Sequence, residues 1–112
     1  MKVDVRLKKG IELFNREEFY ECHEVIEGLW LATQDEYKDL YKGIIQAAVS
    51  LHHLKRGNVR GARKLYHTSK KYLKGYQPRV LGLDIKKLTQ NLEECFERNS
   101  KYMPKIAWKE ES

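Results

Sequence analysis

The sequence predicts an all-α fold of about five helices, arranged as two stacked helical hairpins and a closing C-terminal helix. Three observations support this prediction. Apolar residues recur at helical spacing through most of the 112-residue chain. Residues that favour turns interrupt this spacing at short intervals. The chain also matches itself coarsely when it is shifted by 40 residues, so that Phe14 falls on Leu54 and Cys22 on Ala62.

The first predicted helix follows Asp4, whose carboxylate suits the N-cap position, and it ends near Asn15. The second begins at Glu17 or Glu18 and runs to Leu31, with acidic residues in its first turns, where the helix dipole favours negative charge. These two helices form the first predicted hairpin.

The third predicted helix, residues 35–55, is apolar nearly all round, which indicates a central place in the core. Gly43 and the alanines that follow it allow neighbouring helices to approach closely. In the next turn, Gly57 suits a helix C-cap and Asn58 an N-cap. The fourth helix is amphipathic and ends at Gly75. Together these helices form the second hairpin, and the pair of hairpins is of a tetratricopeptide-like kind.

The fifth predicted helix is capped by Asp84, and its inward-facing positions continue to Met103, where Pro104 stops it. The segment before it, around Pro78 and Gly82, is expected to be an irregular connector. The closing helix therefore completes the predicted domain.

The length predicts one all-helical domain over residues 1–103 and a C-terminal tail over residues 104–112. Ile106 and Trp108 give this tail two large apolar side chains, which either dock on the domain or contact another chain. No stretch is apolar enough for a signal peptide or a membrane span, so we expect a soluble cytoplasmic protein without a membrane partner.

Two cysteines, Cys22 and Cys95, lie on the apolar sides of predicted helices and outside any CxxC pair. A reducing compartment would keep them as small buried thiols, so the sequence favours neither a disulfide nor a thiolate zinc site. No cofactor motif accompanies them.

Residues 23–27 (HEVIE) place polar side chains on the edge of a core-forming helix, which makes them the first candidate site. One interpretation is structural: His23 and Glu27 lie one helical turn apart and pair with each other or with nearby polar groups. Breaking such a contact, if it is buried, is expected to lower the free energy of unfolding by about 1–3 kcal/mol. His23 and Glu27 are therefore the first members of a predicted polar cluster.

The same motif resembles the HExxH helix of zinc hydrolases, with a glutamate where the second histidine belongs. A divalent metal would then need a third ligand, and the metal candidates are His23, Glu27 and His52. General acid–base catalysis is the related alternative, because burial beside aromatic residues could shift the pKa values of these groups. The candidate catalytic residues are His23, Glu24, Glu27 and His53.

The net charge of +6 is unevenly distributed, since residues 55–79 contain nine Lys or Arg and no Asp or Glu. The basic face of the fourth helix comprises Arg60, Arg63, Lys64, Lys70, Lys71 and Lys74. With interleaved tyrosines it has the composition of a surface that binds RNA or anions. The alternatives are a solvated face, or pairing with the acidic flank of the second helix, which we expect to be its neighbour.

Several stretches carry a further signal: 19–30 (FYECHEVIEGLW), 41–53 (YKGIIQAAVSLHH), 56–62 (RGNVRGA), 76–78 (YQP) and 82–84 (GLD). Together they resemble the small all-helical family called domain of unknown function 309, over most of the chain. The resemblance implies an all-α fold of prokaryotic type and no known activity. It implies motif positions at His23, Glu24, Glu27, Trp30, Gly43, Gln46, His53, Gly57, Asn58 and Gly61. The resemblance thereby extends the predicted polar cluster, which comprises His23, Glu27, Trp30, Gln46 and His53.

Three hypotheses about function follow from the sequence. The first is a non-enzymatic interaction module with a structural His/Glu cluster, whose partner is another protein or a second copy of the chain. The second is a small metal-dependent hydrolase or ligand-binding protein that uses the HExxE motif. The third is RNA or anion binding through the basic fourth helix.

Overall fold

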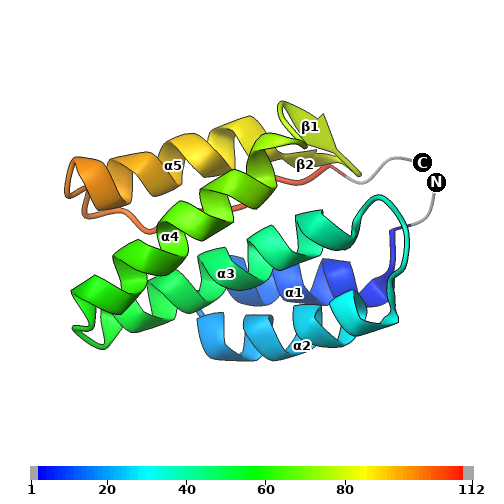
Figure 1. Ribbon diagram of the computed structural model, residues 1–112, viewed down its shortest axis with the longest axis horizontal. Coiled ribbons are helices and arrows are strands. Elements are labelled where there is room, and N and C mark those ends of the chain that lie inside the picture. The colour runs from blue at the N-terminus through cyan, green and yellow to red at the C-terminus, as the bar shows by residue number, and fades with distance from the viewer. Residues whose placement is uncertain (1–2, 110–112) are drawn as a thin grey trace.

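The computed structural model describes residues 3–109 and is predominantly helical, as the sequence predicts (Figure 1). Five helices account for most of the described chain, and a two-stranded hairpin precedes the last of them. The elements are α1 (Val5–Asn15), α2 (Phe19–Ala32), α3 (Lys38–Lys55), α4 (Val59–Lys74), β1 (Arg79–Val80), β2 (Leu83–Asp84) and α5 (Ile85–Glu97).

Three of the helices begin at the polar residues that the sequence marks as N-caps. The side chain of Asp4 accepts a hydrogen bond from the backbone N–H of Arg6, that of Asn58 from Gly61, and that of Asp84 from Lys87. Each bond satisfies one of the N–H groups that the first turn of a helix leaves without a partner. The predicted starts of α1, α4 and α5 are therefore confirmed.

The turns of the two hairpins share one backbone conformation, 40 residues apart. Glu17 and Gly57 both have positive φ, at 63° and 83°. The N–H of the next residue, Glu18 or Asn58, donates to the carbonyl oxygen five residues earlier, at 2.9 Å in both turns. The coarse sequence repeat therefore corresponds to a repeated turn, whereas the likeness to tetratricopeptide repeats stays a prediction.

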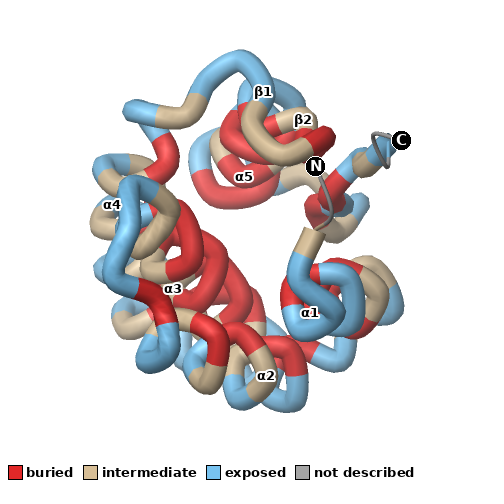
Figure 2. The backbone as a smooth tube through the Cα atoms, turned by 90° about the vertical axis from the view of Figure 1, so that its right-hand side faces the viewer, coloured by how far each residue is buried: buried red, intermediate tan, exposed pale blue. Residues whose placement is uncertain are grey.

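Helix α3 lies in the middle of the fold, with α2 packed on one side and α4 on the other (Figure 1). Its buried residues face the centre of the molecule (Figure 2). The closest approach to α4 is at Gly43, where an added Cβ would lie 2.8 Å from Leu73 Cδ2. Beside it, Ser69 Oγ donates a buried hydrogen bond of 2.7 Å to the Gly43 carbonyl oxygen. The predicted close packing at Gly43 is confirmed.

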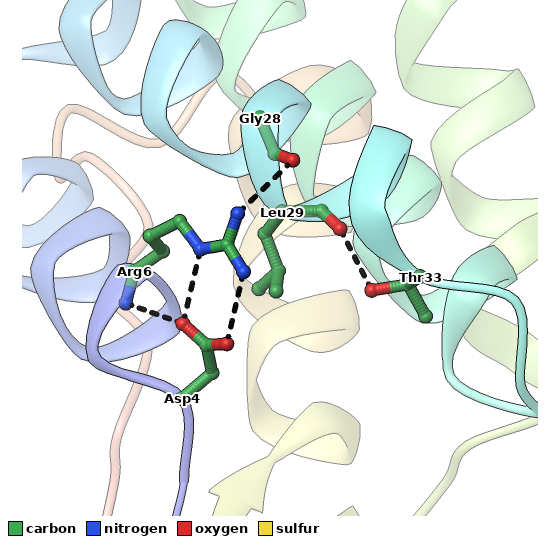
Figure 3. A network of polar contacts seen from close by, with 5 residues as sticks. All are labelled: Asp4, Arg6, Gly28, Leu29 and Thr33. Atoms are coloured by element: carbon green, nitrogen blue, oxygen red, sulfur yellow. Dashed lines mark hydrogen bonds and ion pairs between the residues drawn. The ribbon is translucent and has the colours of Figure 1, made fainter.

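A polar network ties the start of α1 to the end of α2 (Figure 3). The guanidinium of Arg6 donates to both carboxylate oxygens of Asp4, each at 3.2 Å, and to the Gly28 carbonyl oxygen at 3.4 Å. The hydrogen bonds from Arg6 hold the pKa of Asp4 below its usual value. Nearby, Thr33 Oγ1 donates to the Leu29 carbonyl oxygen at 2.7 Å, which closes the last turn of α2.

Helix α5 ends at Glu97, six residues before the predicted end at Met103. The chain turns at Asn99, which has a φ of 54°, and the Ser100 N–H donates to the Glu94 carbonyl oxygen at 3.0 Å. Asparagine tolerates this left-handed conformation better than most residues. The predicted stop at Pro104 is therefore wrong.

The predicted irregular connector contains a short antiparallel hairpin, with Arg79 opposite Asp84. Leu81 and Gly82 form its two-residue turn, both with positive φ, at 50° and 82°. Such a turn matches the natural twist of paired strands. The hairpin then leads directly into α5, because Asp84 is both the end of β2 and the N-cap of the helix.

The C-terminal segment docks on the domain as far as it is described, while residues 110–112 lie outside the described range. Trp108 forms a bridge to Leu83, and Ile106 is 2% exposed. The side chain of Asn15 donates to the Ile106 carbonyl oxygen at 3.0 Å and accepts from its N–H at 2.7 Å. The tail was predicted either to dock on the domain or to contact another chain, and in the structure Ile106 and Trp108 dock on the domain.

Both cysteines are buried free thiols, as expected. Among the described helices, none has the length and apolar character needed to cross a membrane.

Candidate functional site

The candidate site is an open cleft of about 250 Å³ between α2 and α3, which we call the α2–α3 cleft. Its lining residues are Tyr20, His23, Val49, His52 and His53. The first two come from the start of α2 and the others from the second half of α3. Because the two helices run antiparallel and are joined by a short connection, these segments lie side by side.

Aromatic rings form most of the surface of the α2–α3 cleft. The ring of Tyr20 lies 5.5 Å from that of His23 and 5.6 Å from that of His52, measured between centroids. The rings of His52 and His53 are 6.1 Å apart. Tyr20 is 50% exposed, so solvent reaches its ring. The cleft therefore combines ring faces that solvent can reach with imidazole nitrogens.

His23 makes the predicted contact with Glu27, one turn further along α2. Its Nε2 lies 3.4 Å from Glu27 Oε2, and its Nδ1 lies 3.3 Å from the Tyr20 carbonyl oxygen. The side chains of His23 and Glu27 are 25% and 51% exposed, so water solvates much of the pair. An exposed pair of this kind contributes less to stability than a buried polar contact.

We expect Glu27→Ala to lower the free energy of unfolding by less than about 1 kcal/mol. This is smaller than the loss expected if the contact were buried, because solvent screens the pair. Chemical denaturation at pH 7 would measure it, with Glu24→Ala as the control, since Glu24 is an exposed glutamate on the same helix. A loss above about 2 kcal/mol for Glu27→Ala alone would show that the pair acts as a buried contact.

Two members of the predicted polar cluster lie away from the α2–α3 cleft. Trp30 stands at the opposite end of α2, where the ammonium groups of Lys38 and Lys42 lie 4.4 and 4.6 Å from its ring centroid. Lys38 Nζ also donates to the Trp30 carbonyl oxygen at 2.8 Å, which caps the end of α2. Gln46 has a buried side-chain oxygen without a hydrogen-bond partner. The cleft thus brings together His23 and His53 but not Trp30 or Gln46.

The metal candidates do not converge on one point. Within residues 3–109, no three side chains of His, Cys, Asp or Glu are grouped closely enough to hold a metal ion. His23 faces Glu27, while His52 contacts the ring of Tyr20. Glu24 is exposed and is not among the residues that line the cleft. The arrangement therefore offers two neighbouring ligands rather than a coordination sphere.

Sequence reasoning missed Tyr20 and Val49 as parts of the cleft. A signal was available in the helical spacing, because Tyr20 precedes His23 by three residues and Val49 precedes His53 by four. Residues at these spacings share one side of a helix. A bulky residue one turn from a polar motif residue is thus part of the same surface.

A second hollow, of about 330 Å³, lies near the start of α1, and its lining includes Asp4, Thr33, Asp35, Tyr37 and Tyr41. Burial raises the pKa of Tyr41 to about 12, and the nearby Asp35 and Asp4 raise it further. Tyr41 therefore stays protonated at neutral pH. Both aspartates already accept hydrogen bonds from backbone N–H groups: Asp4 from Arg6 as the N-cap of α1, and Asp35 from Tyr37.

The basic face of α4 is partly neutralised by α5 and not by α2. Arg63 pairs with Glu97 at 2.8 Å, and Lys70 pairs with Glu93 at 2.9 Å. The hydrogen bond to Glu93 raises the pKa of Lys70. The alternative in which this face pairs with the acidic flank of α2 is therefore wrong, because α5 lies beside α4 instead. The other predicted members of this face are exposed: Arg60, Lys64, Lys71 and Lys74.

Comparison with known proteins connects the chain to one family. The family model described as "Domain of unknown function (DUF309)" matches residues 7–65. "Uncharacterized protein YpuF" of Bacillus subtilis (strain 168) is 32% identical over 91 residues, which cover 79% of this chain and 52% of that protein. An "Uncharacterized protein" of Aquifex aeolicus (strain VF5) is 29% identical over 89 residues, which cover 79% of this chain and 27% of that protein. The chain spans about half or less of the length of these curated relatives.

Proposed function

We propose that this chain, which belongs to the family described as "Domain of unknown function (DUF309)", is a non-enzymatic helical module that binds a partner polypeptide in the α2–α3 cleft. The observation that carries the proposal is the open, aromatic lining of the cleft on two packed helices. Exposed aromatic side chains are enriched where proteins bind one another.

The chemistry of the α2–α3 cleft suits a partner that inserts one apolar or aromatic side chain. Tyr20 and Val49 offer apolar surface, and the three imidazoles offer ring faces and hydrogen-bonding nitrogens. The helices that carry these groups are fixed by the core, so binding need not order them. Within residues 3–109, His23 and Glu27 have no third side chain of His, Cys, Asp or Glu grouped with them to hold a metal, so the cleft suits recognition better than metal-dependent hydrolysis.

The lengths of the relatives support a domain that acts together with further polypeptide segments. The matched region covers 52% of the Bacillus subtilis protein and 27% of the Aquifex aeolicus protein. The similar part therefore occurs within longer chains. A small domain with a preformed cleft can then act as a docking unit for a neighbouring segment or a separate protein.

A photo-crosslinking amino acid at position 20 tests the proposal. The tyrosine at this site is half exposed and lies in the α2–α3 cleft, so a bound partner must come within reach of it. Irradiation of cells that natively produce the protein is expected to give one discrete adduct. The adduct should disappear when Val49→Glu is also present, because a carboxylate in the cleft disfavours an apolar side chain.

The matched control places the same crosslinker at Tyr102, which is 86% exposed and lies outside the cleft. This protein should not give the same adduct. An adduct of twice the chain mass would identify a second copy as the partner. If no adduct forms at position 20, or if Val49→Glu leaves it unchanged while the protein stays folded, the α2–α3 cleft is not the docking site.

A further inference from the structure

Five residues of α4 form a straight line on its outer side. Their spacing alternates between four and three residues, which keeps side chains on one side of a helix. At 1.5 Å per residue, the line from first to last is about 21 Å long. We call this line the α4 stripe, and it comprises Arg60, Lys64, His67, Lys71 and Lys74. All are exposed, and exposed parts of α4 lie at the outer edge of the molecule (Figure 2).

The α4 stripe keeps its positive charge, whereas four of the five other cations in residues 55–79 form ion pairs. Of the nine Lys and Arg in residues 55–79, four pair with carboxylates: Lys55 with Glu17, Arg63 with Glu97, Lys70 with Glu93 and Arg79 with Asp84. The four cations of the stripe form no ion pair within the described residues 3–109. No carboxylate in residues 55–79 offsets them. The two sides of α4 therefore differ in charge. Carboxylates of α5 neutralise the cations on the side that faces α5, and the outer side keeps its positive charge.

We propose that the α4 stripe binds the phosphodiester backbone of a nucleic-acid strand, without reading its sequence. A row of evenly spaced cations matches a linear polymer that carries one negative charge per nucleotide. A single line of cations suits one backbone rather than the two walls of a groove. At the C-terminal half of the stripe, His67, Lys70, Lys71 and Lys74 line an open hollow of about 350 Å³, so basic side chains surround this part of the surface. This inference is independent of the α2–α3 cleft.

The structure favours nucleic acid over an anionic membrane. A helix that binds in a membrane interface inserts an apolar face beside its cations. The apolar side of α4 is already occupied, since Ala62, Tyr66 and Leu73 are fully buried in the core. The stripe can therefore supply charge but not an inserted apolar surface. Phosphate contacts alone suffice for non-specific binding to nucleic acid.

The test uses a fluorescent 12-nucleotide strand of uridines and the full chain, over a range of salt concentrations. The wild-type protein is expected to bind with a slope of log K against log salt of about −3, because each of four cations contributes about −0.7. The double variant Lys64→Gln/Lys71→Gln should reduce the slope by about half and weaken binding by more than about tenfold in 50 mM salt. Glutamine keeps the helix propensity of lysine.

The matched control removes two charges at the same spacing of seven residues, one in α1 and one at the C-cap that follows it, in Lys9→Gln/Arg16→Gln. It has the same net charge as the test variant and should bind like the wild type. Lys64→Arg/Lys71→Arg, which keeps the charge, should also bind. Equal weakening in the two glutamine variants would overturn the proposal, and so would wild-type binding to phosphatidylserine vesicles without binding to the strand.

Discussion

Replacing Gly43 with valine is expected to lower the free energy of unfolding by about 3 kcal/mol. An added Cβ would lie 2.8 Å from Leu73 Cδ2, 2.9 Å from Leu73 Cγ and 3.2 Å from Tyr72 Cβ. Such distances force either a rotamer change or a shift of α4 away from α3. A shift would also weaken the buried hydrogen bond from Ser69 to the Gly43 carbonyl oxygen. Urea denaturation at pH 7 measures the loss.

Gly28→Ala is the matched control, because it also replaces a glycine inside a helix. An added Cβ at Gly28 has no atom within 4 Å, so the substitution is expected to raise stability by about 0.5–1 kcal/mol. In a Leu73→Ala background, the loss caused by Gly43→Val should be smaller, because the main clash is absent. Equal stability of Gly43→Val and the wild type would show that α3 and α4 do not pack as closely as described.

Much of the fold could be predicted because the turn residues and the 40-residue repeat indicate the same hairpins. The Gly57–Asn58 turn contains a residue that tolerates positive φ and a residue that caps a helix. The 40-residue repeat points to the same hairpin. In the first hairpin, however, the position with positive φ is Glu17, a residue that seldom adopts it. Only the repeat, and not the turn residue itself, indicates that the two turns are alike.

The features that sequence reasoning missed depend on contacts between distant residues. Leu81 adopts a φ of 50° in the β1–β2 turn, although leucine gives no local signal for it. The hairpin is held partly from outside, because the Lys109 N–H donates to the Gly82 carbonyl oxygen and Asp84 N–H to that of Ala107. A window of neighbouring residues contains none of these partners. The end of α5 has a local signal, because Asn99 tolerates the positive φ that ends the helix before Pro104 is reached.

The candidate site was predictable in part. The predicted polar cluster contains His23 and His53, and the antiparallel packing of α2 and α3 brings both into the lining of the α2–α3 cleft. The predicted cluster also contains Gln46 and Trp30, which the family resemblance marks as motif positions. Helical spacing gives the side of a helix but not the position along it. His23 lies near the start of α2 and Trp30 near its end, so the two residues lie at opposite ends of the interface between α2 and α3.

Raising the pH is expected to destabilise the protein through Cys22. Burial raises the pKa of this thiol from 9.0 to about 12. Because the folded-state pKa is the higher one, the contribution of Cys22 to stability is fully present below pH 9.0 and is lost as the pH rises toward 12. The loss should reach roughly 2 kcal/mol by about pH 10.5 and about 4 kcal/mol near pH 12.

Cys22→Ala isolates this effect, since alanine cannot ionise. Other groups that titrate in this range, including Cys95 and the tyrosines, are the same in both proteins. The free energy of unfolding should therefore fall less steeply with pH in Cys22→Ala than in the wild type, as urea denaturation at several pH values between 8 and 10.5 would show.

The pH dependence of Cys22→Ala also tests whether the HExxE motif at residues 23–27 has a nucleophile beside it. Cys22 and His23 are neighbours in sequence, and a thiolate beside an imidazole is a familiar nucleophile. Helical geometry turns the two side chains apart: Cys22 is fully buried, whereas His23 lines the open cleft. Parallel pH curves for Cys22→Ala and the wild type would mean that the thiol ionises as easily in the folded chain as in the unfolded one. A nucleophile would then be available beside His23. A steeper curve for the wild type places the thiol in the core, which leaves recognition rather than covalent chemistry to the exposed side of α2.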